Sequence, residues 1–169
     1  MIEQKGSTWL EDAVQPGGYL DITPGCEDSF HYVHEAIHKL GKEYTHDRLI
    51  AKLTLGFWAN QFAAKQFAAA GSSLLQIFPQ RSPGTKQKTI YENLIRINDI
   101  RNRIAHHEPI CFDAGNISVI RALNRYNLML ELLNWLGCNP IRMLYGIDGV
   151  SKACDRINNI MDYSYETSA

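Results

Sequence analysis

A run of apolar residues between Lys86 and Pro109 constrains the fold of this chain more than any other feature. Isoleucine and leucine recur there at spacings of three and four, at Ile90, Leu94, Ile97, Ile100 and Ile104. This spacing predicts an amphipathic helix, because side chains at those intervals lie on one helical face. Pro109 ends the predicted helix, since proline lacks an amide hydrogen and restricts the residue before it.

The end of this predicted helix carries a polar sequence, RNRIAHHE, over residues 101–108. At about 100° per residue, Arg101 falls inside the arc of Leu94, Ile97 and Ile104. A guanidinium in an apolar stripe is costly unless it is paired or faces an anion. We therefore expect Arg101 to be buried and to mark a functional site.

Arg101 and His106 are five residues apart, which places them about 140° apart around an ideal helix. They therefore do not share a face. Either the helix distorts or ends before His106, or a second copy of the chain completes the site across a two-fold axis.

The spacing Arg-Asn-x3-His before a helix end resembles the R-x4–6-H motif of HEPN domains, which are helical, usually dimeric endoribonucleases. The longer sequence RNRIAHHEPI and the upstream run LTLGFWANQF, residues 53–62, resemble the Abi-like (abortive infection) branch of that family. The similarity covers residues 45–137. It implies an all-α, HEPN-like helical bundle that forms a homodimer, with the site shared across the interface.

The resemblance also implies an activity: metal-independent RNA cleavage that leaves 2′,3′-cyclic phosphate and 5′-OH ends, in phage defence or as a toxin. Histidine suits proton transfer near neutral pH, and arginine stays cationic and can hold two phosphate oxygens. His106 is then the general acid/base, Arg101 holds the phosphate, and Asn102, four residues before His106, is close enough on the helix to orient it. The implied partners are an RNA substrate and an antitoxin or a phage-derived trigger, and no cofactor is expected.

The neighbouring residues extend the motif. Arg103 and His107 are further candidates for substrate contact, although His107 could equally cap the helix end with positive charge. We expect Glu108 to be structural. A HEPN fold that binds RNA or a protein without cutting is the main alternative function.

A second alternative, a zinc hydrolase, rests on His34-Glu35-Ala36-Ile37-His38, a formal match to the H-E-x-x-H motif. Histidines four residues apart on a helix can share a metal, with the glutamate as base. The third ligand of the extended motif would fall at Tyr44, no glutamate on a following helix replaces it, and the usual strands are missing. We therefore expect no metal site.

Composition adds few constraints. The net charge of −1 gives no global basic field, so any RNA contact must come from local basic residues. The cysteines are widely spaced and form no CxxC pair, which indicates reduced thiols: Cys26, Cys111, Cys138 and Cys154. No apolar run reaches the length of a membrane span. With no signal peptide, we expect a cytoplasmic protein without membrane contact.

Along the chain we expect an irregular N-terminal arm over residues 1–29, a helical domain over 30–162 and a tail over 163–169. Gly41 should close a helix over residues 30–40, and Thr45 should cap a long helix that ends at Gly71. A basic connector over 71–85 leads to the motif helix. Two more helices, over about 117–136 and 149–161, follow on either side of Asn139-Pro140. The expectation is a bundle of four to five helices with no strands.

Overall fold

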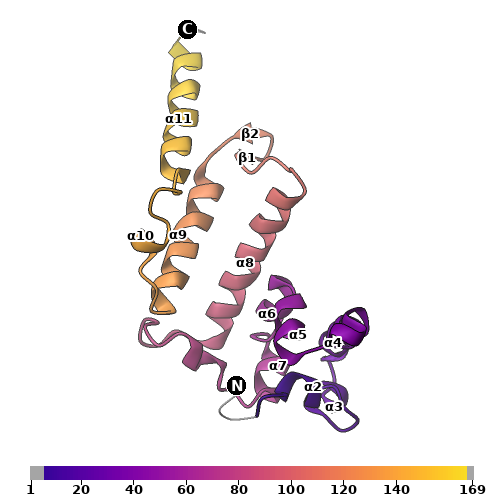
Figure 1. Cartoon of the computed structure of the whole chain (residues 1–169). Coiled ribbons are helices and arrows are strands. Elements are labelled where there is room, and N and C mark those ends of the chain that lie inside the picture. The colour runs from indigo at the N-terminus through magenta and orange to yellow at the C-terminus, as the bar shows by residue number, and fades with distance from the viewer. Residues whose placement is uncertain (1–5, 167–169) are drawn as a thin grey trace. The chain divides into compact units, whose positions relative to one another are not determined.

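The computed structural model describes residues 6–166, with side chains through residue 162. It is mostly helical, so the predicted all-α class is confirmed. The described residues form two compact units, residues 6–77 with 84–95, and residues 78–83 with 96–166 (Figure 1). This division differs from the expected boundaries after residues 29 and 162. The helix count also differs, since the described residues form ten α-helices, several of them only one turn long.

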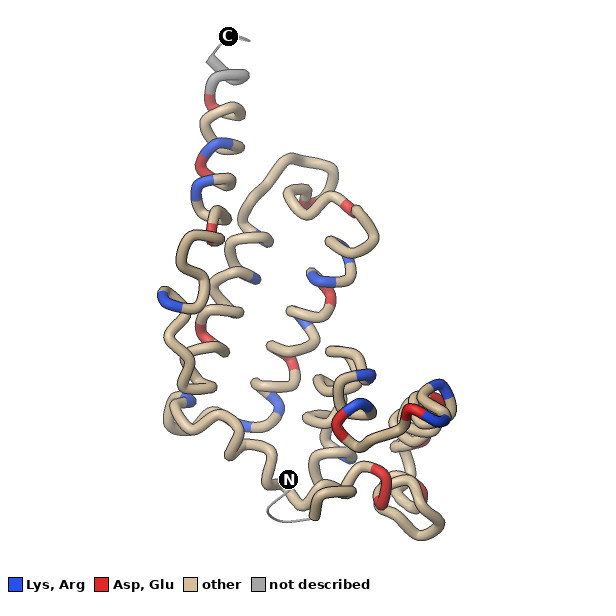
Figure 2. The backbone as a smooth tube through the Cα atoms, viewed as in Figure 1, with Lys and Arg blue, Asp and Glu red and all other residues tan. Residues whose placement is uncertain are grey.

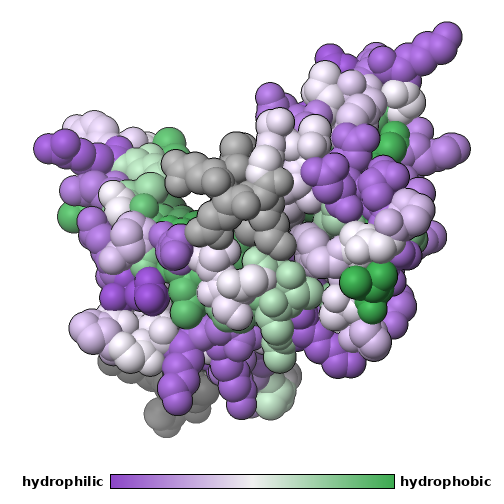
Figure 3. All heavy atoms as spheres, turned by 90° about the horizontal axis from the view of Figure 1, so that it is seen from below, coloured by the Kyte–Doolittle hydropathy of each residue, from purple (hydrophilic) through white to green (hydrophobic). Residues whose placement is uncertain are grey.

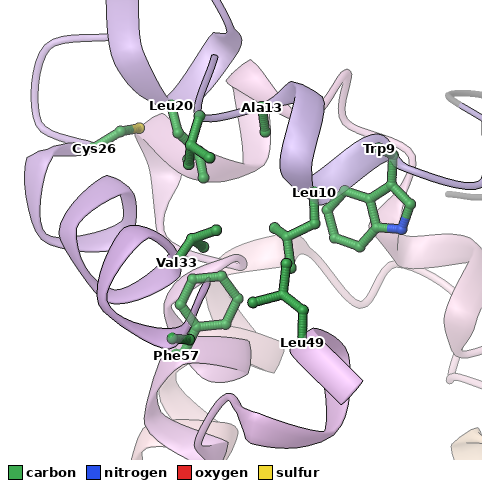
Figure 4. Packing of buried hydrophobic residues seen from close by; sticks show 10 residues of the cluster. Trp9, Leu10, Ala13, Leu20, Cys26, Val33, Leu49 and Phe57 are labelled. Carbon is green, nitrogen blue, oxygen red and sulfur yellow. The ribbon is translucent and has the colours of Figure 1, made fainter. Parts of the chain in front are cut away.

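The N-terminal segment is part of the first core, and its described residues include two short helices where we expected a mostly irregular arm. Helices α2 (Trp9–Asp12) and α3 (Tyr19–Ile22) flank a tight turn. Gly18 allows that turn, because a Cβ there would lie 2.4 Å from the carbonyl oxygens of Asp12 and Ala13. Ten buried residues share one cluster (Figure 4): Trp9, Leu10, Ala13, Val14, Leu20, Cys26, Val33, Ala36, Leu49 and Phe57.

Helix α4 spans Glu27–Leu40 and ends at Gly41, which has a positive φ of 49°, as predicted from the sequence. A 3-10 turn, η1 (Gly41–Glu43), leads to α5 (His46–Lys52). Thr45 caps α5 by accepting a hydrogen bond from the amide of Arg48, so this predicted cap is also confirmed.

The long helix predicted from Thr45 to Ala70 is wrong, because it is three short helices. These are α5, α6 (Leu55–Asn60) and α7 (Ala64–Ala69). The first break has a clear local cause. Thr54 adopts an extended conformation and its hydroxyl accepts from the amide of Phe57, so a new helix starts there. The connector that follows contains a 3-10 turn, η2 (Leu74–Ile77).

Helix α8 spans Gln87–Ala105 and contributes residues to both units. The side chain of Gln87 donates to the carbonyl oxygen of Phe62, which attaches the start of α8 to the first unit. The apolar stripe is confirmed at Ile90 and Ile100, which are buried, but it weakens toward the end of the helix, where Ile104 is 55% exposed.

In the second unit, residues 96–105 of α8 and helix α9 (Ile120–Trp135) run in opposite directions (Figure 1). A β-hairpin of β1 (Phe112–Asp113) and β2 (Asn116–Ile117) connects them. The expectation of no strands was therefore wrong. Ala114 and Gly115 both have positive φ, the backbone that a two-residue hairpin turn requires.

Two further helices pack against α9. Pro140 is the first residue of α10 (Pro140–Met143), and Asn139 caps it, so this pair starts a short helix after the break. Helix α11 spans Val150–Glu166, four residues further than residue 162, where we expected the domain to end, and Asp148 accepts from the amide of Val150. Residues 167–169 of the predicted tail lie outside the described residues.

The second unit has a smaller apolar interior, which includes Ile100, Val119, Ala122, Tyr126, Leu132, Trp135 and Cys154. On the face in Figure 3, hydrophobic residues form separate patches among hydrophilic ones. All four cysteines lie within the described residues as free thiols. Among the described helices, none combines the length and the hydropathy that crossing a bilayer requires.

Candidate functional site

The residues of the predicted motif lie together at the C-terminal end of α8. Arg101, Asn102 and Arg103 occupy its last turns, and His106 and His107 follow directly after its last residue, Ala105. Arg101, His106 and His107 are exposed, whereas Asn102 and Arg103 are partly buried. The second unit contains all five residues.

The end of α8 is a complete helix C-cap of the Schellman type. The amide of His107 donates to the carbonyl oxygen of Ile104 at 3.1 Å. The amide of Glu108 donates to the carbonyl oxygen of Arg103 at 2.8 Å. His107 stands at the C′ position with a φ of 57°, where glycine is the usual residue. A left-handed residue with a side chain costs roughly 1–2 kcal/mol. His107 is therefore held in a conformation that the surrounding cap enforces.

Arg103 fixes the chain beyond that cap. Its Nη2 donates to the carbonyl oxygen of Pro109 at 2.8 Å, and its Nε lies 3.3 Å from Oε2 of Glu108. Its side chain is 22% exposed, against 53% for Glu108. Arg103, which we had expected as a substrate contact, thus holds residues 108 and 109 against the helix. Glu108 has the structural role expected of it.

The expectation that Arg101 is buried in the apolar stripe was wrong. Arg101 is exposed, and its Nη1 donates to Oδ1 of Asn102 at 3.1 Å. The physical reason is the weakening of the stripe, because the end of α8 projects beyond the apolar interior and Ile104 is itself exposed. The guanidinium of Arg101 therefore faces solvent in the single chain and is accessible to an anion.

The structure resolves only part of the difficulty that Arg101 and His106 lie about 140° apart around an ideal helix. Helix α8 ends before His106, which was one of the two alternatives predicted from the sequence. The amide of His106 still donates to the carbonyl oxygen of Asn102 at 2.9 Å, so its backbone continues the helical path for one more residue. The side chain of Asn102 pairs with Arg101, and its expected contact with His106 is not among the hydrogen bonds of the described residues.

The described residues around His34, Glu35 and His38 do not form the ligand arrangement that the zinc alternative requires. His34, Glu35 and His38 are exposed on α4, and the ring of His34 packs against Phe30 at 4.9 Å between centroids. Glu35 pairs with Lys39 at 2.7 Å, and the hydrogen bond from Lys39 lowers the pKa of Glu35. A lowered pKa makes this carboxylate a poorer base. Across residues 6–162, no three His, Cys, Asp or Glu side chains gather in a way that could hold a metal ion.

Two features of the site were missed from the sequence. Only a weak feature of the sequence pointed to the ion pair of Arg103 with Glu108, namely opposite charges five residues apart around a predicted helix end. No feature of the sequence pointed to the left-handed conformation of His107, because histidine is an uncommon C′ residue. No family model matches the chain, and comparisons with curated proteins and with solved structures gave no match.

Proposed function

We propose that this chain is a metal-independent endoribonuclease of the HEPN Abi-like type, acting in phage defence or as a toxin. The observation that carries the proposal is the pair of exposed side chains, Arg101 and His106, on either side of the capped end of α8. The cap and the contacts of Arg103 support the proposal because they hold the backbone around both residues. A site on a held backbone loses less entropy when substrate binds.

In the proposed reaction the 2′-oxygen of one nucleotide attacks the adjacent phosphorus, and the bond from phosphorus to the 5′-oxygen breaks. One histidine takes the proton of the 2′-OH, and a second histidine gives a proton to the leaving 5′-oxygen. The products are a 2′,3′-cyclic phosphate and a 5′-OH. Arg101 holds the two non-bridging phosphate oxygens, whose negative charge grows in the five-coordinate state.

A single chain offers one His106, whereas the reaction uses a base and an acid. A homodimer with both motif ends around one cleft would supply the second histidine, and it would let the Arg101 of one copy act with the His106 of the other. This arrangement accommodates the separation of about 140° around α8. An antitoxin or a phage-derived trigger would then act by blocking or exposing that cleft.

The test is cleavage of a single-stranded RNA by purified protein in EDTA, with the end groups of the products identified. Arg101→Ala and His106→Ala should each lower the rate by roughly 10²–10⁴-fold. Both residues are exposed, so their variants should keep the helicity and melting temperature of the parent. His34→Ala, an exposed histidine on α4, is the matched control and should cleave at the parent rate.

Three outcomes would overturn parts of the proposal. A folded His106→Ala protein that cleaves at the parent rate would remove His106 from the chemistry. Loss of cleavage in EDTA with recovery in zinc would favour the hydrolase alternative. RNA binding that depends on Arg101, without cleavage by any variant or by the parent, would favour the binding-module alternative.

A further inference from the structure

A polar groove lies between α8 and α9 in the second unit, separate from the motif at the end of α8. It is lined by Arg96 from α8 and by five residues of α9, Asn124, Arg125, Asn127, Leu128 and Glu131. It holds about 550 Å³ and is open to solvent, since Arg96, Asn124, Asn127 and Glu131 are all exposed. Helix α8 carries several basic positions, and α9 carries basic positions near its start (Figure 2). The groove is therefore large enough for one nucleotide.

The two arginines of the groove have no partner among the described residues. Neither Arg96 nor Arg125 forms a hydrogen bond or an ion pair there, and the Nε of Arg125 is shielded from solvent as well. By contrast, Arg121, one turn before Arg125 on α9, pairs with Asp113 at 3.0 Å. A shielded donor without an acceptor is costly, so an acceptor from a ligand would relieve a real penalty.

The basic residues of the chain are sorted by type between the units. Eight of the nine arginines but only one of the eight lysines fall in the second unit. Arginine presents a planar set of donors that fits two phosphate oxygens at once, whereas lysine is a point charge. The arginine-rich composition of the second unit therefore favours phosphate over a general attraction for anions.

The carboxylate of Glu131 disfavours a simple anion in this groove. Its carboxylate lines the same groove and can only accept hydrogen bonds. A free phosphate would be repelled by it, but a ribonucleotide presents a 2′-OH donor beside its phosphate. The amides of Asn124 and Asn127 can both donate and accept, so they suit a base edge.

We propose that this groove binds one nucleotide of a single-stranded RNA, with the phosphate on Arg96 and Arg125 and the ribose 2′-OH on Glu131. The inference rests on the proposed function, since it supplies that enzyme with a second contact on its substrate. Arg96 and His106 are ten residues apart, about 15 Å along the axis of α8 at 1.5 Å per residue. A strand held in the groove thus reaches the motif within a few nucleotides, and the groove sets the distance from the held nucleotide to the cut.

The test measures binding apart from cleavage, by fluorescence anisotropy of a short single-stranded RNA in a His106→Ala background. Arg96→Gln and Arg125→Gln should each raise Kd by about tenfold. The double variant Arg96→Gln/Arg125→Gln should also lower the slope of log K against log salt by about 0.7, the value for one phosphate contact on a single strand. Glu131→Gln should reduce the preference for RNA over DNA of the same sequence, because DNA lacks the 2′-OH.

Arg156→Gln is the matched control, because Arg156 is an exposed arginine of the second unit that does not line the groove. It should leave Kd within about twofold and the salt slope unchanged. Arg125→Lys covers the case in which Arg125→Gln fails to fold. It keeps the charge but loses the paired donors, and should still weaken binding.

Unchanged Kd and salt slope in the folded Arg96 and Arg125 variants would overturn the proposal, and so would equal weakening in Arg156→Gln. Full competition by a free mononucleotide at the Kd of the RNA would overturn the assignment to a strand. Absence of RNA binding by the His106→Ala parent would also overturn the proposal that the groove binds RNA. Groove-dependent binding without cleavage by the wild type would instead leave the groove standing and count only against the nuclease.

Discussion

Arg103 and Glu108 form an ion pair across the end of α8, with 3.3 Å between Nε and Oε2. Because Arg103 also donates to the carbonyl oxygen of Pro109, one guanidinium holds the two residues that follow the histidines. The position of His106 and His107 is thereby coupled to a residue that need not touch substrate. Arg103 is a positioning residue in this interpretation.

Replacing Arg103 separates positioning from chemistry. Arg103→Ala should lower the free energy of unfolding by about 1–2 kcal/mol, because it removes a charged hydrogen bond to a carbonyl and a partly exposed ion pair. Glu108→Gln removes only the ion pair and should cost less than about 1 kcal/mol. Urea unfolding of the two variants measures both values. Equal losses would mean that the contact with Pro109 contributes nothing.

His107 gives a prediction of opposite sign. Its φ of 57° suits glycine better than a side chain, so His107→Gly should raise the free energy of unfolding by about 0.5–1 kcal/mol. His107→Val should lower it, since a β-branched residue resists this conformation. Thermal unfolding followed by circular dichroism measures both. A destabilised glycine variant would show that the imidazole makes a contact worth more than the backbone strain.

The sequence predicted the helices whose ends carry local signals. Gly41 and Thr45 mark boundaries through backbone freedom and side-chain capping, and both act as expected. Prediction failed where tertiary packing decides. Trp9 and Leu10 look isolated in a stretch rich in glycine and proline, yet they are buried in the first core. The break at Thr54 was readable in principle, since threonine caps helices, but the alanine-rich run that follows masked it.

At the candidate site, the location of the motif at a helix end was predictable and the environment of its arginine was not. The helical period places Arg101 in the apolar stripe, but burial depends on whether the core extends that far along α8. It does not, as the 55% exposure of Ile104 shows. Arg96 and Arg125 could not have been paired from the sequence, because their groove forms only when α8 and α9 lie side by side.

Tyr44 gives a prediction about pH. Its hydroxyl donates to Oε2 of Glu11 at 2.7 Å, a contact between residues 33 apart in the sequence. Burial and then this hydrogen bond raise the pKa of Tyr44 to about 12, above the value near 10 expected in the unfolded chain. Because its pKa is raised in the folded state, folding favours the neutral phenol of Tyr44. The contribution of Tyr44 to the free energy of unfolding is therefore complete below about pH 10 and is lost as pH rises toward about 12.

The melting temperature of the wild type should therefore fall more steeply above about pH 10 than that of Tyr44→Phe, which cannot ionise there. Tyr32→Phe controls for the general effect of alkali, because Tyr32 is 52% exposed. The melting temperature of Tyr32→Phe should follow the same dependence on pH as that of the wild type. Parallel curves for the wild type and Tyr44→Phe would show that the contact with Glu11 does not hold the N-terminal segment.

The structure changes the reasons for expecting a homodimer. A buried Arg101 no longer argues for it, but exposed apolar side chains at the same end of the α8–α9 pair do. These residues are Ile104, Phe112, Ile117 and Ile120, with exposures of 55%, 43%, 50% and 68%. Phe112 and Ile117 are also direct neighbours across the hairpin, so they form one apolar surface beside the motif.

If this surface is the dimer interface, Phe112→Asp and Ile117→Glu should each give a monomer in light scattering where the wild type is a dimer. Cleavage should be lost with the dimer and recover partly as protein concentration rises, because association follows mass action. Ile141→Glu is the matched control, since Ile141 is 81% exposed on α10 at a distant point of the sequence, and it should remain dimeric and active. A wild type that is monomeric and fully active at all concentrations would contradict the shared site. His106 would then have to act as both base and acid within one chain.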